Sequence, residues 1–200
     1  MPPPAAVPAL VPYLAALPDP RRGQGRRHPL GAILALSCAA MLAGADSLLA
    51  IAEWGRDPAG GAPLATRLGF TRAKTPCVAT LHRVFRRLDA AAFEAAVGAW
   101  AADAAGAVGR DPGPVGVAVD GKVLRGSAAV GVPAVRLLAA LRHDLGLTLA
   151  EARVPDGREE ATALPDLLAA LVVEGAVLTL DAAFAERAVA AAIAEKGGTT

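Results

Sequence analysis

Two short apolar runs in the second half of the chain each lead into an aspartate, and they limit most strongly what this sequence can fold into. Val115–Val119 precedes Asp120, and Ala176–Leu180 precedes Asp181. Both runs are rich in aliphatic and β-branched residues, which predicts buried strands with a carboxylate at the C-terminal exit of each. Because ligands bind at the carboxyl ends of strands in α/β sheets, these two aspartates are the first candidates for a metal site.

The pattern of the chain changes between Gly109 and Pro114, a stretch of turn-forming residues. The helices expected before it are Leu30–Leu42, Leu48–Trp54 capped by Asp46 and Ser47, a short piece at Leu64–Leu68, Cys77–Leu88 opened by Thr75 and Pro76, and a helix from Asp89 to about Ala105. The elements expected after it are strands Val115–Asp120, Ala134–Arg142 and Leu147–Val154, helix Thr162–Val173, strand Ala176–Leu180 and helix Ala183–Glu195. The sequence therefore predicts an α+β chain with a helical N-terminal domain, residues 1–110, and a sheet-containing domain, residues 111–200.

Charge is distributed unevenly between these two parts. Residues 1–110 hold 12 Lys and Arg against 7 Asp and Glu, whereas residues 111–200 hold 8 against 12. A basic half joined to an acidic half fits a module that neutralises phosphates beside one that gathers cations. The alternative is that this difference in charge is an accident of surface composition without a functional role.

Composition favours a cytoplasmic globular protein. Pro29–Ala45 carries no charge, but its content of Ala, Gly and Ser and its short length indicate a buried helix rather than a membrane span. The first residues lack the basic region of a secretory signal. The two cysteines, Cys38 and Cys77, fall inside predicted helices without metal-site spacing, so we expect small buried side chains in a reducing cytosol.

Each aspartate also has a purely structural interpretation. Asp120 is followed by Gly121, and an Asp-Gly pair is a common hairpin turn. Asp181 could cap the helix that follows it. In the functional interpretation, Lys122 and Arg125 lie just beyond Asp120 and offer cationic contacts to a phosphate chain.

Two further groups of cations lie in the first half of the chain. One is the loop that holds Arg21, Arg22, Arg26 and Arg27, which is better suited to backbone phosphates than to base edges. The other is the predicted helix Cys77–Leu88, which carries Arg83, Arg86 and Arg87. A helix that contacts DNA would use such residues, but a solvated cationic face on an amphipathic helix has the same pattern.

Several motifs resemble one known family over nearly the whole chain. They are Leu17–Arg22, Arg27–Leu30, Leu42–Ser47, Ile51–Trp54, Thr80–Val84, Leu88–Asp89, Phe93–Glu94, Ala118–Ser127, Leu137–Ala140, His143, Leu171–Ala182 and Gly197–Gly198. In these motifs the chain is similar to the ISAs-type insertion-sequence transposases, also known as the H-repeat-associated proteins.

The resemblance implies a DDE transposase that cuts and joins DNA by two-metal in-line displacement, with Asp120 and Asp181 as catalytic carboxylates and ligands of Mg²⁺ or Mn²⁺. It implies an RNase-H-like catalytic domain, which the order of the predicted elements also fits, and double-stranded DNA at transposon ends as the partner, with a homo-oligomer left open. The DNA-binding residues expected from the chain are Arg21, Arg22, Arg26, Arg27, Arg83, Arg86, Arg87, Lys122 and Arg125.

The third carboxylate of such a site has no counterpart in the sequence up to Thr200, with Glu160 and Glu186 as the first candidates to test. We therefore expect a C-terminally truncated, incomplete catalytic domain and a chain that is inactive by itself. A non-catalytic DNA-binding remnant that competes with an intact transposase is the alternative, and a divalent-metal nuclease of the same fold is a third interpretation.

Overall fold

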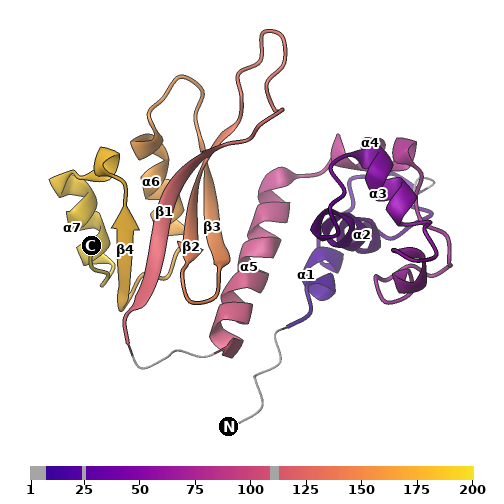
Figure 1. The fold of residues 1–200 in the computed structure, drawn as a ribbon, viewed down its shortest axis with the longest axis horizontal. Coiled ribbons are helices and arrows are strands. Elements are labelled where there is room, and N and C mark those ends of the chain that lie inside the picture. Colours follow the sequence, from indigo (N-terminus) through magenta and orange to yellow (C-terminus); the bar gives the residue numbers. More distant parts are fainter. Residues whose placement is uncertain (1–7, 24–25, 109–112) are drawn as a thin grey trace. The chain divides into compact units, whose positions relative to one another are not determined.

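The computed structural model describes residues 8–23, 26–108 and 113–200 (Figure 1). The described chain falls into two compact units, Pro8–Trp100 and Ala101–Thr200, apart from residues 109–112, which lie outside the described residues. The first unit is helical and the second contains a sheet, and the division between them lies at Trp100 and Ala101. The fold is thus a mixture of α and β structure, and each unit is described by itself.

The helical unit is built around one apolar helix. Its elements are α1 (Val11–Ala15), α2 (Leu30–Leu42), α3 (Leu48–Trp54), the 3-10 helix η2 (Ala62–Leu64), α4 (Val78–Phe85) and α5 (Ala90–Val108), which continues beyond the unit. Residues 30–37 of α2 are all buried, and the hydroxyl of Ser37 donates to the Ile33 carbonyl at 2.9 Å, so its polar atom is satisfied. Helix α2 is therefore the core helix of this unit.

The charge-free run that contains α2 is not a membrane span. No helix among the described residues is both long enough and apolar enough to cross a bilayer. Helix α2 instead packs with Leu14, Ile51, Leu81 and Val84 from the helices around it.

The start of α4 differs from the prediction. Thr75 and Pro76 were expected to cap and open this helix, but the N-cap is Cys77 and the helix begins at Val78. The hydroxyl of Thr75 donates to the Gly55 carbonyl at 3.1 Å instead, so a tertiary contact takes the side chain that the pattern assigned to a cap. The thiol of Cys77, expected to be buried, is exposed.

The caps of the neighbouring helices confirm the prediction. The Ser47 hydroxyl accepts a hydrogen bond from the Ala50 amide at the start of α3, and the Asp89 carboxylate accepts one from the Ala92 amide at the start of α5. The expected helical piece at residues 64–68 is wrong, because the helical turn lies earlier, in η2.

The second unit is a four-stranded mixed sheet with short helices. Its elements are β1 (Val115–Val123), β2 (Arg136–Arg142), β3 (Leu147–Val154), the 3-10 helix η3 (Glu160–Ala163), α6 (Leu164–Ala169), β4 (Ala176–Leu180), the 3-10 helix η4 (Ala182–Phe184) and α7 (Arg187–Glu195). The strand order is β3-β2-β1-β4. Strands β1, β2 and β3 are joined antiparallel, and β4 runs parallel to β1.

One face of this sheet carries the core of the unit. Val117 and Val119 of β1 lie buried with Leu138 of β2 and Leu178 of β4, and α6 packs on the same core with Leu167. Because alternate residues of a strand point to opposite faces, the residues between the buried ones lie on the other face, which includes the exposed Asp120. The sheet thus separates a packed face from a face that carries polar side chains.

The helices of the sheet unit are shorter than predicted. The expected helix Thr162–Val173 is η3 followed by α6, and the expected helix Ala183–Glu195 is split into η4 and α7. Phe184 at the end of η4 is buried in the core, and the backbone at Glu186 is extended, so burial of an aromatic side chain interrupts an alanine-rich segment. Strand β2 also begins two residues later than expected.

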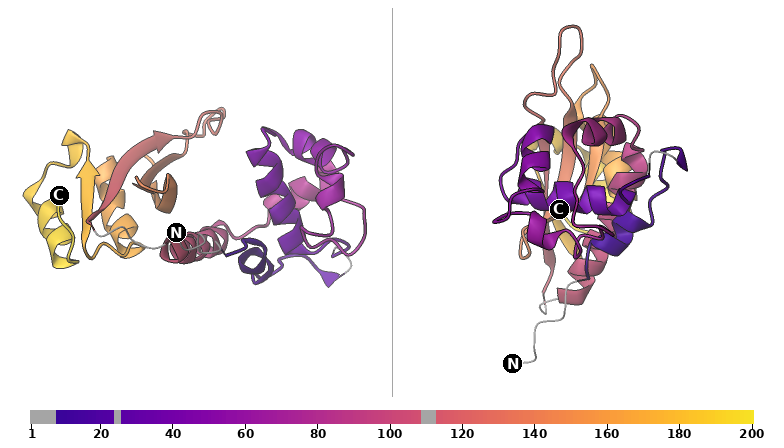
Figure 2. Two further views of the ribbon diagram at one scale, coloured as in Figure 1. Left: turned by 60° about the horizontal axis from the view of Figure 1, so that its bottom comes forward. Right: turned by 90° about the vertical axis from the view of Figure 1, so that its right-hand side faces the viewer.

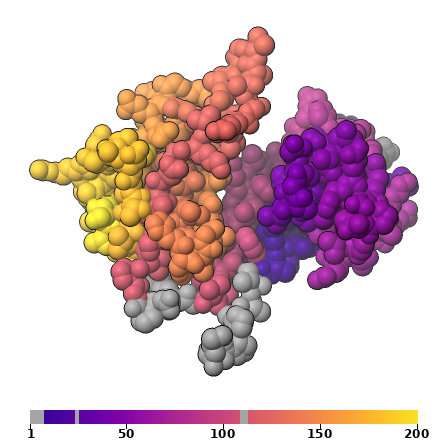
Figure 3. Space-filling view, viewed as in Figure 1, coloured from indigo at the N-terminus to yellow at the C-terminus, as the bar shows by residue number. Residues whose placement is uncertain are grey.

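A long loop, residues 124–135, joins β1 to β2. It projects beyond the strands of its own unit in every view (Figures 1 and 2), and the space-filling view shows the same protrusion (Figure 3). The hydroxyl of Ser127 donates to the Leu124 carbonyl and accepts from the Val135 amide, which closes the base of the loop. Near the C-terminus, Thr199 pairs in parallel with Val177 on the free side of β4.

Candidate active site and cationic cavity

Asp120 lies inside a strand, not at the end of one. Strand β1 continues to Val123, and its register places Asp120 opposite Ala139 of β2. The prediction that the strand ends at Asp120 is therefore wrong, and so is the alternative of an Asp-Gly hairpin turn. The side chain remains exposed, on the face of the sheet opposite the core.

The register of the sheet brings Asp181 beside Asp120. The parallel pairing of β1 with β4 ends with Val119 opposite Leu180. Asp120 and Asp181 are the residues that follow these two. Neighbouring strands are about 4.8 Å apart, so the two backbones lie about one strand spacing from each other at this point. Both residues are exposed, and Asp181 itself lies just beyond the end of β4.

The Asp181 carboxylate already has one partner. It accepts a hydrogen bond from the Ala182 amide at 2.5 Å and so caps the 3-10 helix η4. This contact is the capping role that the sequence left open. A carboxylate accepts several hydrogen bonds or metal contacts, so the cap leaves further lone pairs available.

Two adjacent carboxylates are suitable donors for one magnesium ion. Mg²⁺ prefers hard oxygen ligands and commonly uses one or two carboxylates together with waters and substrate phosphates. Within residues 8–23, 26–108 and 113–200, no group of three or more Asp, Glu, His or Cys side chains is close enough to hold a metal ion. Two carboxylates alone would leave most ligand positions of such an ion to water or substrate oxygens.

The carboxylate of Glu160 approaches the same part of β1. It lies where a Cβ atom on Gly121 would stand, so only a glycine leaves room for it. Because Gly121 and Asp120 are consecutive residues of a strand, this position is on the opposite face from Asp120. Glu186, the other candidate for a third ligand, is exposed at the residue before α7.

The two cations predicted near Asp120 are exposed. Lys122 is two residues further along β1 and hence on the same face as Asp120. Arg125 follows in the projecting loop. No acidic residue occurs between Gly121 and His143, so this hairpin is positive within an otherwise acidic half of the chain.

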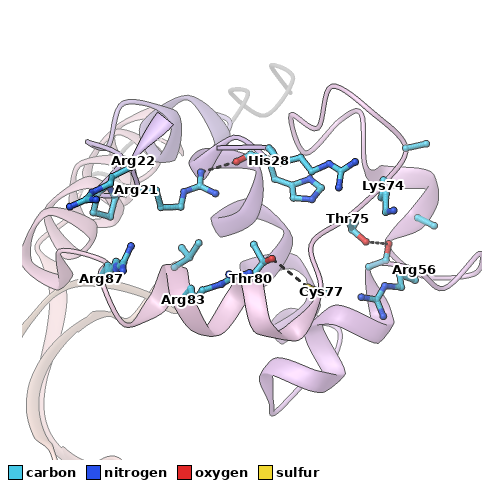
Figure 4. Close-up of a pocket in the computed structure, with 16 residues that line it drawn as sticks. Arg21, Arg22, His28, Arg56, Lys74, Thr75, Cys77, Thr80, Arg83 and Arg87 are labelled. Atoms are coloured by element: carbon cyan, nitrogen blue, oxygen red, sulfur yellow. Dashed lines mark hydrogen bonds between the residues drawn. The ribbon is translucent and has the colours of Figure 1, made fainter. Parts of the chain in front are cut away.

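The cations of the first half gather around one cavity of about 1210 Å³ in the helical unit (Figure 4). The predicted DNA-binding residues that line it are Arg21, Arg22, Arg27, Arg83 and Arg87. Arg26 and Arg86 are not among its lining residues. Sequence reasoning missed Arg56 and the role of Lys74, because these residues come from separate segments that only the fold brings together. It also missed His28, although this residue directly follows Arg27 in the predicted cationic loop.

One ion pair organises the loop that forms a wall of this cavity. The guanidinium of Arg21 donates to both oxygens of Asp19, at 2.9 and 2.8 Å, and also to the His28 carbonyl at 2.7 Å. Arg26 adds a weaker ion pair to Asp19 and donates to the Arg21 carbonyl. The hydrogen bond from Arg21 holds the pKa of Asp19 below its ordinary value. Arg21 therefore fixes the loop as well as lining the cavity.

The pKa of His28, which lines the cavity, is affected by burial and by the cations around it. Its ring packs edge-on against Phe70, with 5.7 Å between the ring centroids. Burial lowers its pKa, and the positive charges of Arg27, Arg21 and Lys74 lower it further. Protonation of the His28 ring is therefore disfavoured.

Comparison with known proteins finds one family model and several relatives that match this chain. Residues 11–101 match the family described as DDE_Tnp_1-associated. The chain is 37% identical over 205 residues to "Uncharacterized protein in dhlA 3'region" of Xanthobacter autotrophicus, covering 97% of this chain and 64% of that protein. No solved structure matches the chain.

Two relatives in Escherichia coli strain K12 have descriptive names. "Putative transposase YncI" is 28% identical over 193 residues, which cover 96% of this chain and 75% of that protein. "H repeat-associated putative transposase YhhI" is 26% identical over 197 residues, which cover 94% of this chain and 49% of that protein. The chain thus spans only about half to three quarters of the relatives it matches. In its N-terminal domain and over nearly its whole length, the chain is thus similar to insertion-sequence transposases, including the H-repeat-associated proteins.

Proposed function

We propose that the sheet unit is the catalytic part of a DDE-type transposase, which cuts and joins DNA phosphodiesters at transposon ends. The observation that carries the proposal is the pairing of β1 with β4, because it makes Asp120 and Asp181 neighbours although they are far apart in the sequence. The names of the relatives support the same chemistry.

An RNase-H-like fold for this unit is part of the proposal. Three antiparallel strands followed by a helix and a fourth strand parallel to the first give the order β3-β2-β1-β4, with the first strand in the interior. The pairing of Thr199 with Val177 adds a further parallel connection on the other side of β4. This topology supports the assignment.

In this proposal Asp120 and Asp181 would hold Mg²⁺ or Mn²⁺. A bound divalent ion activates an attacking water or 3′-hydroxyl and stabilises negative charge on the leaving oxygen. Lys122 and Arg125 neutralise phosphates of the bound strand, and Asp181 is oriented by its hydrogen bond to the Ala182 amide. Double-stranded DNA is the proposed substrate.

The number of ligands sets the expected activity. The proposed site has two carboxylates, and among the described residues no group of three or more metal-ligating side chains occurs, whereas two ions require more ligands. We therefore expect at most trace nicking from the 200-residue chain and no strand transfer. A non-catalytic protein that binds DNA in competition with a complete transposase is the second candidate. It is favoured by the cavity, whose cations all lie within the helical unit.

Metal binding tests the site in the chain itself. Titration with Mn²⁺, followed by electron paramagnetic resonance, should show an ion whose affinity falls about tenfold or more in Asp120→Asn and in Asp181→Asn. The control is Asp166→Asn, because Asp166 is an exposed carboxylate on α6. Equal Mn²⁺ affinity in all four proteins would refute the proposed site.

Cleavage tests the chemistry. A chain extended with the C-terminal part of the Xanthobacter relative should nick supercoiled plasmid in a Mg²⁺-dependent reaction, and Asp120→Asn should abolish it. Full cleavage by the 200-residue chain would contradict the ligand count and would point to Glu160 or Glu186 as the additional ligand.

A further inference from the structure

The cavity in the helical unit is lined by an unusual excess of positive charge. Seven of its sixteen lining residues are Lys or Arg, and none is Asp or Glu. They come from the loop before α2, the turn after α3, the segment before α4, α4 itself and the turn that follows it. Figure 4 shows Arg83 on α4, and Arg87 just after this helix, across the cavity from Arg21, Arg22 and His28.

Most of this charge is not neutralised by ion pairs with the residues that the structure describes. Asp19 pairs with Arg21, but among the described residues no ion pair involves the six other lining cations, Arg22, Arg27, Arg56, Lys74, Arg83 and Arg87. Like charges that converge on a concave surface repel each other and focus a positive potential into it. The lowered pKa of His28, caused by burial and by three of the lining cations, is consistent with that potential.

The size and the lining of the cavity indicate what kind of anion it takes. A volume of about 1210 Å³ exceeds the roughly 300–1,000 Å³ of small-molecule sites, and six unpaired cations exceed what one phosphate needs. Binding sites for unpaired bases use aromatic rings as stacking surfaces. The cavity has no Phe, Tyr or Trp among its described lining residues, so its chemistry favours phosphates rather than bases.

We propose that this cavity holds a stretch of the sugar–phosphate backbone of DNA, with several consecutive phosphates between α4 and the loop that contains Arg22 and Arg27. That the nucleic acid is DNA rests on the proposed transposase function. The hydroxyl of Thr80, which also lines the cavity, offers a neutral hydrogen bond to the backbone.

A thiol inside the cavity provides a direct reporter. Cys77 lines the cavity at the N-cap of α4, its side chain is exposed, and its Sγ shares a hydrogen bond with Oγ1 of Thr80 at 3.4 Å. That hydrogen bond lowers the pKa of Cys77, whereas burial raises the pKa of Cys38. Because the chain has only these two cysteines, Cys38 serves as an internal control.

Alkylation of the unaltered chain tests whether DNA binds in the cavity. Iodoacetamide should modify Cys77 faster than Cys38 at neutral pH, and a saturating 20-base-pair duplex should slow modification of Cys77 by about tenfold while Cys38 is unchanged. Equal Cys77 rates with and without duplex would overturn the proposal. Equal protection by inorganic phosphate alone would also overturn it, because a site for a single anion would then explain the cations. Protection by RNA but not by DNA would contradict the assignment to DNA.

A pair of matched variants tests the cations by fluorescence anisotropy of a labelled duplex. Lys74→Ala/Arg83→Ala removes two cavity cations and should weaken binding at low salt about tenfold or more and reduce the salt slope by about two. Arg67→Ala/Arg72→Ala removes two exposed cations of the same unit that do not line the cavity, and it should change the affinity less than about threefold. Equal losses in the two variants would show diffuse surface attraction and would overturn the proposal.

These outcomes are separable from those at the aspartates. If duplex DNA does not protect Cys77, Mn²⁺ binding at Asp120 and Asp181 is still expected. If Mn²⁺ does not bind at these aspartates, protection of Cys77 by duplex is still expected.

Discussion

Replacing Asp19 by asparagine tests whether one ion pair holds the loop that forms a wall of the cationic cavity. Arg21 is only 6% exposed and Asp19 16% exposed, and two charge-assisted hydrogen bonds join them. The amide of asparagine cannot accept both, and it leaves the buried guanidinium without its counter-charge. Breaking a buried pair costs about 3–5 kcal/mol, and we expect about 3 kcal/mol here because Asp19 is partly exposed.

Tryptophan fluorescence measures this loss in the correct unit. Both tryptophans of the chain, Trp54 and Trp100, belong to the helical unit, so urea unfolding followed by their emission reports on that unit. In thermal unfolding followed by the same emission, a loss of about 3 kcal/mol corresponds to a fall in Tm of about 15 °C for a domain of this size. Asp46→Asn is the control, because Asp46 is exposed, and it should change the free energy of unfolding by less than about 0.5 kcal/mol.

The pH dependence supplies a second readout of the same pair. The pKa of Asp19 is lowered in the folded state, so its stabilisation is complete above the unfolded pKa of about 4 and is lost as the pH falls through the lower folded pKa. The stability difference between the unaltered chain and Asp19→Asn should therefore narrow below about pH 4. A difference under about 1 kcal/mol at pH 7, or one that stays constant from pH 7 to pH 2, would refute the reasoning.

Three further outcomes are expected. Ser47→Ala removes the cap of α3 and should lower the free energy of unfolding by about 1 kcal/mol, as measured by tryptophan fluorescence, whereas Ser47→Asp should retain most of it. Leu178→Ala empties part of the core of the sheet unit and should cost about 2–5 kcal/mol by circular dichroism, and a cost below about 1 kcal/mol would contradict that core. The pKa of His28, followed by NMR, should rise when duplex DNA binds, because phosphates offset the cations that lower it. An unchanged value at saturation would contradict binding in the cavity.

Local signals predicted several elements to the residue. Helix α2 follows from a charge-free run between a proline and a glycine, and α3 from the Ser47 cap. Strands β3 and β4 follow from short apolar runs between turn residues. The start of α4 could not be predicted, because Thr75 is a good cap by pattern and its bond to Gly55, twenty residues away, exists only in the folded chain.

The candidate site depended on pairing that no local pattern contains. The sequence indicated Asp120 and Asp181 separately, but the parallel register of β1 with β4 makes them neighbours. The cavity is a similar case, since Arg56 and Lys74 lie in segments with no signal of their own and become important only beside Arg83. Residue types could be predicted from sequence, whereas their convergence required long-range contacts.

The placement of the two aspartates gives them different mechanical properties. Asp120 lies in a strand that is paired with β2 up to Val123, so its backbone can move only when the sheet itself opens. Asp181 lies in the turn after β4, where its own side chain holds the next amide. Local opening of that turn costs far less free energy than opening of the sheet, and amide hydrogen exchange would be fast at Ala182 and slow in the middle of β1. In the proposed metal site, Asp120 would therefore be the rigid ligand and Asp181 the adjustable one, so that the distance between the two carboxylates could change without any rearrangement of the sheet.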